Sequence, residues 1–218
     1  MSRKNTILFI IVGIIAIALI AGGFVYKYYA SLHTITIKVQ ASDLNVDVYK
    51  QKAGVDEQDA ESGEKQGTVK GTKTMSLQAG TYFMLPQGSK YDVSPISFIV
   101  EDKDMTVTAN PGFSEEYLTS LLKQELPAIK AVIVAKYPIA TTNFKLNDGK
   151  LYDDGTWYGT TLVQNANVGN NGDVYRTVLR KVNGIWQFAA APELILGAPT
   201  HKDIPKSILT DLNNQTGY

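Results

Sequence analysis

The feature that most constrains this chain is an uncharged, apolar stretch close to its N-terminus. Residues 7–25 contain only Ile, Leu, Val, Phe, Ala and Gly. As an α-helix they would extend about 28 Å at 1.5 Å per residue, which matches the hydrocarbon core of a bilayer. The sequence therefore predicts a transmembrane helix over residues 7–25.

A cleaved signal peptide is the competing interpretation of this stretch. Its apolar region is shorter, about 7 to 15 residues, and ends at a small-x-small cleavage site. Here the apolar run leads instead into Tyr-Lys-Tyr-Tyr at residues 26–29, which is typical of an interfacial aromatic belt with a basic anchor. We therefore expect an uncleaved signal anchor. Arg3 and Lys4 favour a cytoplasmic stub over residues 1–6 and an extracytoplasmic remainder, although Lys27 weakens the charge difference.

The amino-acid composition excludes several classes of protein and of functional site. The 218 residues include 21 basic and 21 acidic side chains, so the chain lacks the basic excess that nucleic-acid binding requires. It contains no cysteine, which excludes disulfides, thiolate catalysis and cysteine-ligated metals. An anchored protein of the cell envelope, stabilised by packing alone, fits these limits.

Residues 34–110 have the pattern of a small antiparallel β-sandwich. Alternating β-branched residues predict strands at 34–39, 44–49, 74–77, 81–85, 96–100 and 105–108. Residues between Lys50 and Lys73 are polar, with four glycines and both charge signs, and we expect them to form a mobile loop.

Residues 111–218 have a different pattern, and Asn110-Pro111-Gly112 marks the predicted boundary. Ser114 followed by two glutamates predicts a helix start, and apolar residues then recur at helical spacing as far as Ile133. Pro127 predicts a kink or two short helices, because proline removes an amide donor and clashes one turn back. Tyr137-Pro138 predicts the end of the helical region.

Strands and a final helix follow. Strands are expected at 143–146, 156–163, 174–182 and 185–190, with turns at Asn147-Asp148-Gly149, Asn170-Asn171-Gly172 and Asn183-Gly184. A last helix is expected near Asp203, with Pro205 in its first turn. The chain is therefore predicted to be α+β, with a helix packed on a curved antiparallel sheet in its second domain.

Two family resemblances accompany this pattern. Residues 34–38, 45–49, 77–82, 98–100 and 105–108 resemble strands of PEGA-type or carboxypeptidase-regulatory-like β-sandwiches, although the Pro-Glu-Gly-Ala stretch is absent. The long helix followed by hairpins carrying Trp157 and Asn183-Gly184-Ile185-Trp186 is similar to NTF2-like or cystatin-like domains. Neither resemblance implies a catalytic residue, since fold does not determine function.

Groups suited to catalysis or metal binding are few. His33 and His201 lie in segments that look exposed, and no nucleophile-elbow motif accompanies them. Ser120 and Lys123 fit a Ser-x-x-Lys pattern, but its companion motifs are missing and an amphipathic helix produces this spacing freely. Asp148, Asp153 and Asp154 could supply oxygen ligands to Ca²⁺, yet the EF-hand spacing is absent and solvated turns are the simpler interpretation. We expect no enzymatic centre, no metal and no cofactor.

One strand offers a candidate ligand site. Alternation in residues 174–182 places Arg176 and Arg180 on one face, where two guanidinium groups could bind an anion. If that face is the concave side of the sheet, Tyr158 or Trp186 would line a pocket beside them. The alternative is an ordinary half-exposed face on which arginine stems cover apolar neighbours.

The sequence thus predicts a non-enzymatic, membrane-anchored interaction or scaffold protein of the cell envelope. Its expected partners are the lipid bilayer, through residues 7–25, and another envelope protein, with no nucleic acid. The alternative is an extracytoplasmic module that binds a small molecule or glycan through the second domain's sheet, and an envelope hydrolase is the least supported possibility.

Overall fold

The computed structural model describes residues 27–52, 54, 57–165 and 172–215, and these form an α+β protein with three sheets. The predicted transmembrane helix at 7–25 lies outside the described residues. Within them, no helix is long and apolar enough to cross a membrane. The chain divides into two compact units, one ending at Pro111 and the other containing Gly112 onward together with Ser89–Asp92.

The first unit consists of two β-sheets, with strand orders β4-β1-β7 and β3-β2-β5-β6. Its elements are β1 (Leu32–Val39), β2 (Asn45–Lys50), η1 (Glu57–Ser62), β3 (Glu64–Lys70), β4 (Thr72–Gln78), β5 (Gly80–Gln87), β6 (Ile96–Val100) and β7 (Met105–Ala109). All six strands predicted for this region are present. The expectation of a wholly antiparallel arrangement is wrong for one pair, because β1 and β7 run parallel.

Alternation along the strands explains the core of this unit. Ile35, Ile37 and Val39 on β1 are buried while the residues between them are more exposed, as the two-residue period of a strand requires. Tyr82 on β5 and Phe98 on β6 stack with their ring centroids 5.4 Å apart. Their paired rings add aromatic packing to the aliphatic core.

The expectation of a loop throughout the stretch between Lys50 and Lys73 is wrong. Strand β3 lies within it and pairs with β2, although only Val69 of this strand is buried. An outer strand needs few apolar residues, because its backbone bonds are satisfied by one neighbour and its side chains face water. Asp47 on β2 further holds the strand by accepting hydrogen bonds from Lys65 and Thr68. Burial raises the pKa of Asp47, but these two bonds outweigh it, and its pKa lies below the ordinary value.

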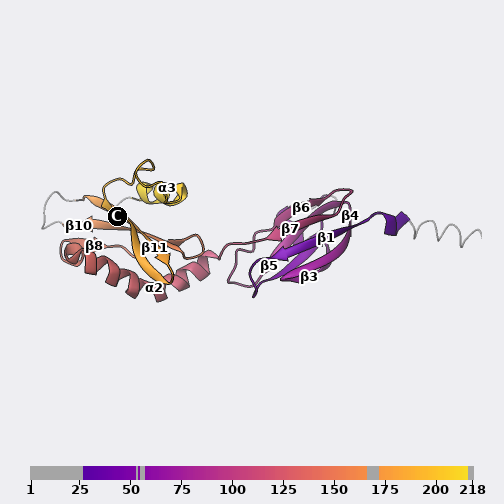
Figure 1. Ribbon diagram of the computed structural model, residues 1–218, viewed down its shortest axis with the longest axis horizontal. Helices are drawn as coiled ribbons and strands as arrows, with labels where there is room; N and C mark the ends of the chain where they lie inside the picture. Colours follow the sequence, from indigo (N-terminus) through magenta and orange to yellow (C-terminus); the bar gives the residue numbers. More distant parts are fainter. Residues whose placement is uncertain (1–26, 53, 55–56, 166–171, 216–218) are drawn as a thin grey trace, which may run out of the picture. The chain divides into compact units, whose positions relative to one another are not determined.

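The second unit is a five-stranded antiparallel sheet with a helix on each face (Figure 1). Strands follow the order β12-β11-β10-β8, and β9 also pairs with β10. The elements are α2 (Glu115–Lys136), η2 (Pro138–Thr141), β8 (Phe144–Leu146), β9 (Lys150–Tyr152), β10 (Trp157–Gln164), β11 (Val174–Val182), β12 (Ile185–Glu193) and α3 (Lys206–Asn214). The predicted helix packed on an antiparallel sheet is present, whereas α3 covers the second face.

Helix α2 begins after Ser114 and ends at Tyr137-Pro138, both as predicted. The Ser114 side chain caps it by accepting a hydrogen bond from the Tyr117 amide at 3.1 Å. The expected division into two short helices is wrong, because a single helix runs through Pro127. Pro127 is exposed, so its ring faces water, and the buried Ile129 and Ile133 beyond it hold the following turns against the sheet.

Residues Asn147-Asp148-Gly149 do not form the expected hairpin turn. The chain continues along the same edge of β10, with β8 and β9 both paired to that strand. Gly149 has φ +69°, and a Cβ there would lie 2.4 Å from the Gly159 carbonyl oxygen. The reversal comes later, at Asp153-Asp154-Gly155, where all three residues have positive φ.

Other predicted turns and the last helix are confirmed where the structure describes them. Asn183 and Gly184 have φ of 51° and 80° and join β11 to β12 in a two-residue hairpin. Pro205 precedes the first turn of α3, and Ile208, Leu209 and Leu212 are the buried residues of that helix. The turn predicted at Asn170-Asn171-Gly172 lies largely outside the described residues.

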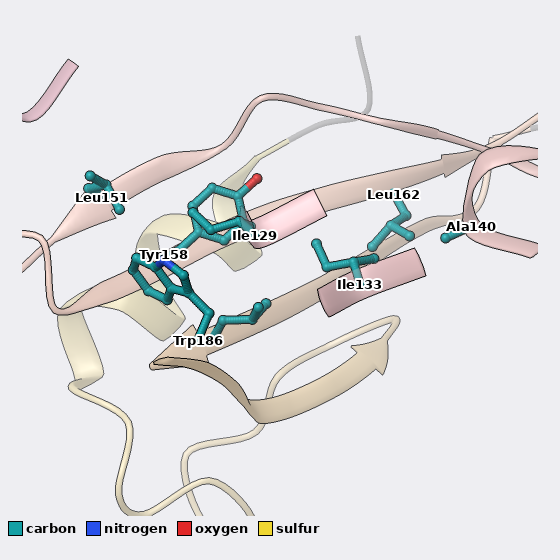
Figure 2. Close-up of a cluster of buried hydrophobic side chains, with 8 residues drawn as sticks. Ile129, Ile133, Ala140, Leu151, Tyr158, Leu162 and Trp186 are labelled. Atoms are coloured by element: carbon teal, nitrogen blue, oxygen red, sulfur yellow. The ribbon is translucent and has the colours of Figure 1, made fainter. Parts of the chain in front are cut away.

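The core between α2 and the sheet surrounds Tyr158, whose side chain is fully buried. Figure 2 shows Ile129 and Ile133 from α2 beside Tyr158, Leu162 and Trp186 from the sheet. The Tyr158 hydroxyl donates to the Asp148 carbonyl at 2.9 Å, and burial raises the pKa of this tyrosine to about 12. Tyr158 is therefore a structural residue of the core.

Candidate binding pocket at the C-terminal end of α2

An open apolar pocket lies where α2 ends against the sheet of the second unit. Its volume is about 250 Å³. It is lined by Tyr137, Ile139, Ala140, Phe144, Leu162, Tyr175 and Pro192, which come from η2, the cap of α2 and four strands. We call it the α2-end pocket. Its lining carries no charged side chain, so it suits an apolar group.

Aromatic contacts fix the walls of the α2-end pocket. Phe144 and Tyr175 meet edge to face with centroids 5.5 Å apart, and Tyr137 meets Phe188 in the same way at 5.3 Å. Tyr137-Pro138 ends α2 at this point and turns the chain into η2, which brings Ala140 beneath the pocket. The pocket is thus shaped by the packing of the fold.

Polar and charged groups at the pocket are few and specific. Among the described residues, the hydroxyls of Tyr137 and Tyr175 have no hydrogen-bond partner and can donate to a ligand. Lys136 is exposed beside the pocket, with Nζ 4.9 Å from the Phe188 ring centroid and 5.9 Å from that of Tyr137. Within the described part of the chain this ammonium has no carboxylate partner.

The four residues predicted as a ligand site lie on opposite faces of the sheet. Tyr158 and Trp186 belong to the core on the α2 face. Arg180 pairs with Trp157, whose ring belongs to the core on the α3 face. Arg176, four residues earlier on the strand, reaches the C-terminal end of α3. The arginines therefore do not share a pocket with either aromatic residue.

Arg176 is held by backbone carbonyls. Its guanidinium donates to Leu212 at 2.9 Å, Gln215 at 2.9 Å and Leu194 at 2.5 Å, so it satisfies carbonyls at the end of α3 and in the preceding loop. Arg180 is exposed, and its guanidinium lies 5.0 Å from the Trp157 ring centroid. The alternative interpretation, in which arginine stems cover apolar neighbours, describes Arg180.

A charged contact joins α2 to the β11–β12 hairpin. Glu125 accepts hydrogen bonds from the Lys181 ammonium at 2.6 Å and from Trp186 Nε1 at 2.8 Å. These two hydrogen bonds hold the pKa of Glu125 below its ordinary value, and the bond from Lys181 has the larger effect. This carboxylate therefore orders the helix and hairpin, and both of its oxygens are occupied.

The groups considered for catalysis are engaged or dispersed. The expectation of exposed histidines is wrong, because the side chains of His33 and His201 are 17% and 10% exposed. His201 lies 3.2 Å from the Glu193 carboxylate and has no serine hydroxyl hydrogen-bonded to it among the described residues. Ser120 and Lys123 are both exposed on α2.

The aspartates considered for Ca²⁺ have other contacts. Asp154 accepts a hydrogen bond from the Phe113 amide at 2.6 Å, and Asp148 lies 3.4 Å from the Lys130 ammonium. In the described part of the chain, no three His, Asp or Glu side chains are grouped closely enough to hold a metal ion.

A second cleft, of about 340 Å³, opens at the other helix. It is lined by Leu118, Lys150, Leu151, Tyr152, Asp153, Pro205, Ser207 and Ile208. The Tyr152 hydroxyl donates to the Asp211 carboxylate, and burial together with this neighbouring charge raises the pKa of Tyr152. That bond ties β9 to α3, which gives the tyrosine a structural role.

No protein-family model, curated protein or solved structure matches this chain. The site must therefore be interpreted from its own geometry. Sequence reasoning missed the α2-end pocket, since its lining comes from residues 137–140 and from four strands that are distant in the sequence from one another. The one available signal was Tyr137-Pro138, which marked the end of the helix without indicating a cavity beside it.

Proposed function

We propose that this chain is a non-enzymatic, membrane-anchored binding protein of the cell envelope, and that its second unit holds a protein partner at the α2-end pocket. The anchor would be residues 7–25, with the folded units outside the cytoplasm. The first unit would be a small extracytoplasmic module attached to the anchor, as the resemblance to PEGA-type modules implies.

The observation that carries this proposal is the pocket itself. An apolar cavity of about 150 Å³ accepts a benzene-sized molecule, so the 250 Å³ here is sufficient for a leucine or phenylalanine side chain. Ile139 at its rim is 56% exposed, which adds apolar surface at the mouth. Buried side-chain anchors surrounded by apolar contacts are the usual centres of protein interfaces.

Site-specific photo-crosslinking in cells tests this proposal. A photoreactive amino acid at Ile139 should capture one discrete partner, and the same residue at the exposed Thr119 on α2 should not. Filling the cavity with Ala140→Met, or placing charge in its lining with Pro192→Asp, should abolish capture by the probe at Ile139. Equal capture from Ile139 and Thr119, or capture unaffected by both substitutions, would refute the proposal.

A small apolar molecule is the second candidate, favoured by the two tyrosine hydroxyls that can orient it. In that case mass spectrometry of the protein purified in mild detergent should detect a bound compound. The compound should be lost on Ala140→Met substitution, and no partner should be captured from Ile139.

A further inference from the structure

The outer edge of β12 lies next to the α2-end pocket and is unpaired in the structure. Strand β12 is the last strand of its sheet, and no other described strand pairs with its free side. Pro192, near the end of the same strand, lines the pocket. Tyr137 of the same lining meets the Phe188 ring on β12 edge to face at 5.3 Å, so the pocket adjoins the first half of this strand as well.

The hairpin geometry identifies which backbone groups face outward. The Lys181 amide donates to the Thr156 carbonyl, on the β10 side, so Lys181 and Trp186 form a pair without mutual hydrogen bonds. The backbone N–H and C=O of Trp186 therefore point away from β11, and those of Phe188 do so two residues later. They form a short row of donors and acceptors that can pair with an added strand.

The first half of this edge lacks the charged residues that usually oppose strand addition. From Ile185 to Pro192 the chain carries no charged residue, and Ile185, Gln187 and Ala189 are exposed. In contrast, the outer strands β3 and β4 of the first unit carry lysines. Lysines on an edge strand oppose pairing with another chain. Register shifts near Val178 and the proline at 192 limit the usable edge to the first half of β12.

Charge beside the edge indicates the character of the added strand. Lys136 lies over the Phe188 ring and has no carboxylate partner among the described residues, whereas Lys181 is neutralised by Glu125. An acidic side chain on the occupant would complement Lys136. Successive residues on one face of a strand are two apart, so an acidic and an apolar residue at that spacing would face Lys136 and the pocket together.

We propose that the partner binds as an extended segment that adds a strand to the outer edge of β12, with one apolar side chain in the α2-end pocket and one acidic side chain facing Lys136. This inference rests on the proposed function and specifies the form of its partner. Main-chain hydrogen bonds would give the segment affinity, and the pocket and Lys136 would select its sequence.

The test uses the full chain in lipid nanodiscs and a blocked heptapeptide. The peptide is threonine throughout except for a central leucine and an aspartate two residues before it. Hydrogen exchange measured by mass spectrometry should show protection of residues 185–189 when the peptide is added. Two N-methylated forms, one for each set of alternate residues, should differ, because an added strand bonds to β12 through one set only.

The expected effects can be stated for each variant. One N-methylated form should bind about tenfold more weakly, as the loss of one or two hydrogen bonds implies. Lys136→Glu should weaken the aspartate peptide about fivefold and favour a peptide with lysine in its place. The matched substitution at another exposed lysine of α2, Lys123→Glu, should have no effect.

Other outcomes would overturn the inference in distinguishable ways. If the peptide binds but both N-methylated forms bind equally well, strand addition is wrong while the pocket proposal remains supported. If the peptide fails to protect residues 185–189 although a probe at Ile139 still captures a partner in cells, strand addition is wrong and the partner binds the pocket in another geometry. If neither occurs, both the inference and the proposed function fail.

Discussion

Removal of the Glu125 carboxylate is the sharpest test of how the second unit is held together. Glu125→Ala leaves the indole N–H of Trp186 without an acceptor, and this residue is only 4% exposed. A buried donor left unsatisfied costs about 1–3 kcal/mol. The ion pair with Lys181 is partly buried, with side chains 29% and 21% exposed, and adds about 1 kcal/mol at most. Alanine has a higher helix propensity than glutamate, and this offsets the loss of stability by a few tenths of a kcal/mol.

We therefore expect Glu125→Ala to lower the free energy of unfolding of the second unit by about 2–3 kcal/mol. Glu125→Gln keeps an oxygen acceptor for Trp186 and should cost about 1 kcal/mol. Denaturant unfolding followed by tryptophan fluorescence is the assay, since Trp157 and Trp186 are the two tryptophans of the chain and both lie in the second unit. The neighbouring exposed Gln124→Ala is the control.

The contribution of Glu125 to stability should depend on pH, and the direction follows from its pKa. The pKa of Glu125 is lower in the folded state than its ordinary value of 4.5, so the folded state favours the ionised form. Its contribution is fully present above about pH 4.5 and is lost as the pH falls through the folded-state pKa. The stability difference between the wild type and Glu125→Gln should shrink below pH 4.5. A difference that is constant with pH, or an alanine variant as stable as Gln124→Ala, would refute the reasoning.

Four further outcomes are expected. Gly149→Ala should lower the unfolding free energy of the second unit by more than about 1 kcal/mol, because residue 149 has a positive φ and the new Cβ would lie 2.4 Å from the Gly159 carbonyl oxygen. A smaller effect in the same denaturation assay would contradict this geometry. Arg176→Ala should lower the unfolding free energy by about 2 kcal/mol, because its hydrogen bonds to backbone carbonyls are lost, whereas Arg180→Ala should lower it by less than about 1 kcal/mol. Equal losses of stability would contradict the different contacts of the two arginines. Tyr91→Ala should destabilise the second unit by about 3 kcal/mol, since Tyr91 is buried there against Phe113, and an unchanged melting curve would show that Ser89–Asp92 does not stabilise it. The full chain should remain in the membrane fraction at high salt, and recovery of a soluble form beginning near Ser31 would show that the predicted anchor is cleaved.

Local sequence determined much of the secondary structure. Alternating β-branched residues located the strands of the first unit, because a strand with one buried face must repeat every two residues. Ser114 and Asn183-Gly184 were equally informative, since a helix cap and a tight hairpin each depend on the chemistry of one or two residues. These features require no knowledge of distant contacts.

The failures of sequence reasoning have a common cause in tertiary packing. Pro127 predicted a kink or two short helices, and the second alternative is wrong because the packing of Ile129 and Ile133 against the sheet stabilises the turns that follow the missing hydrogen bond. The polar residues of β3 resembled a loop, because an outer strand paired on one side needs little apolar surface. In both cases distant residues supplied the stabilisation that the local segment lacked.

The candidate site depends almost wholly on tertiary structure. The sequence placed Arg176 and Arg180 correctly on one face of a strand, because alternation along a strand is a local property. Which residues share a pocket depends instead on the register between strands and on which helix covers each face. The register paired Arg180 with Trp157 on the α3 face and set Tyr158 on the other. The end of α2 then produced an apolar cavity that no single segment of the sequence encodes, because its walls meet only when the helix packs on the sheet.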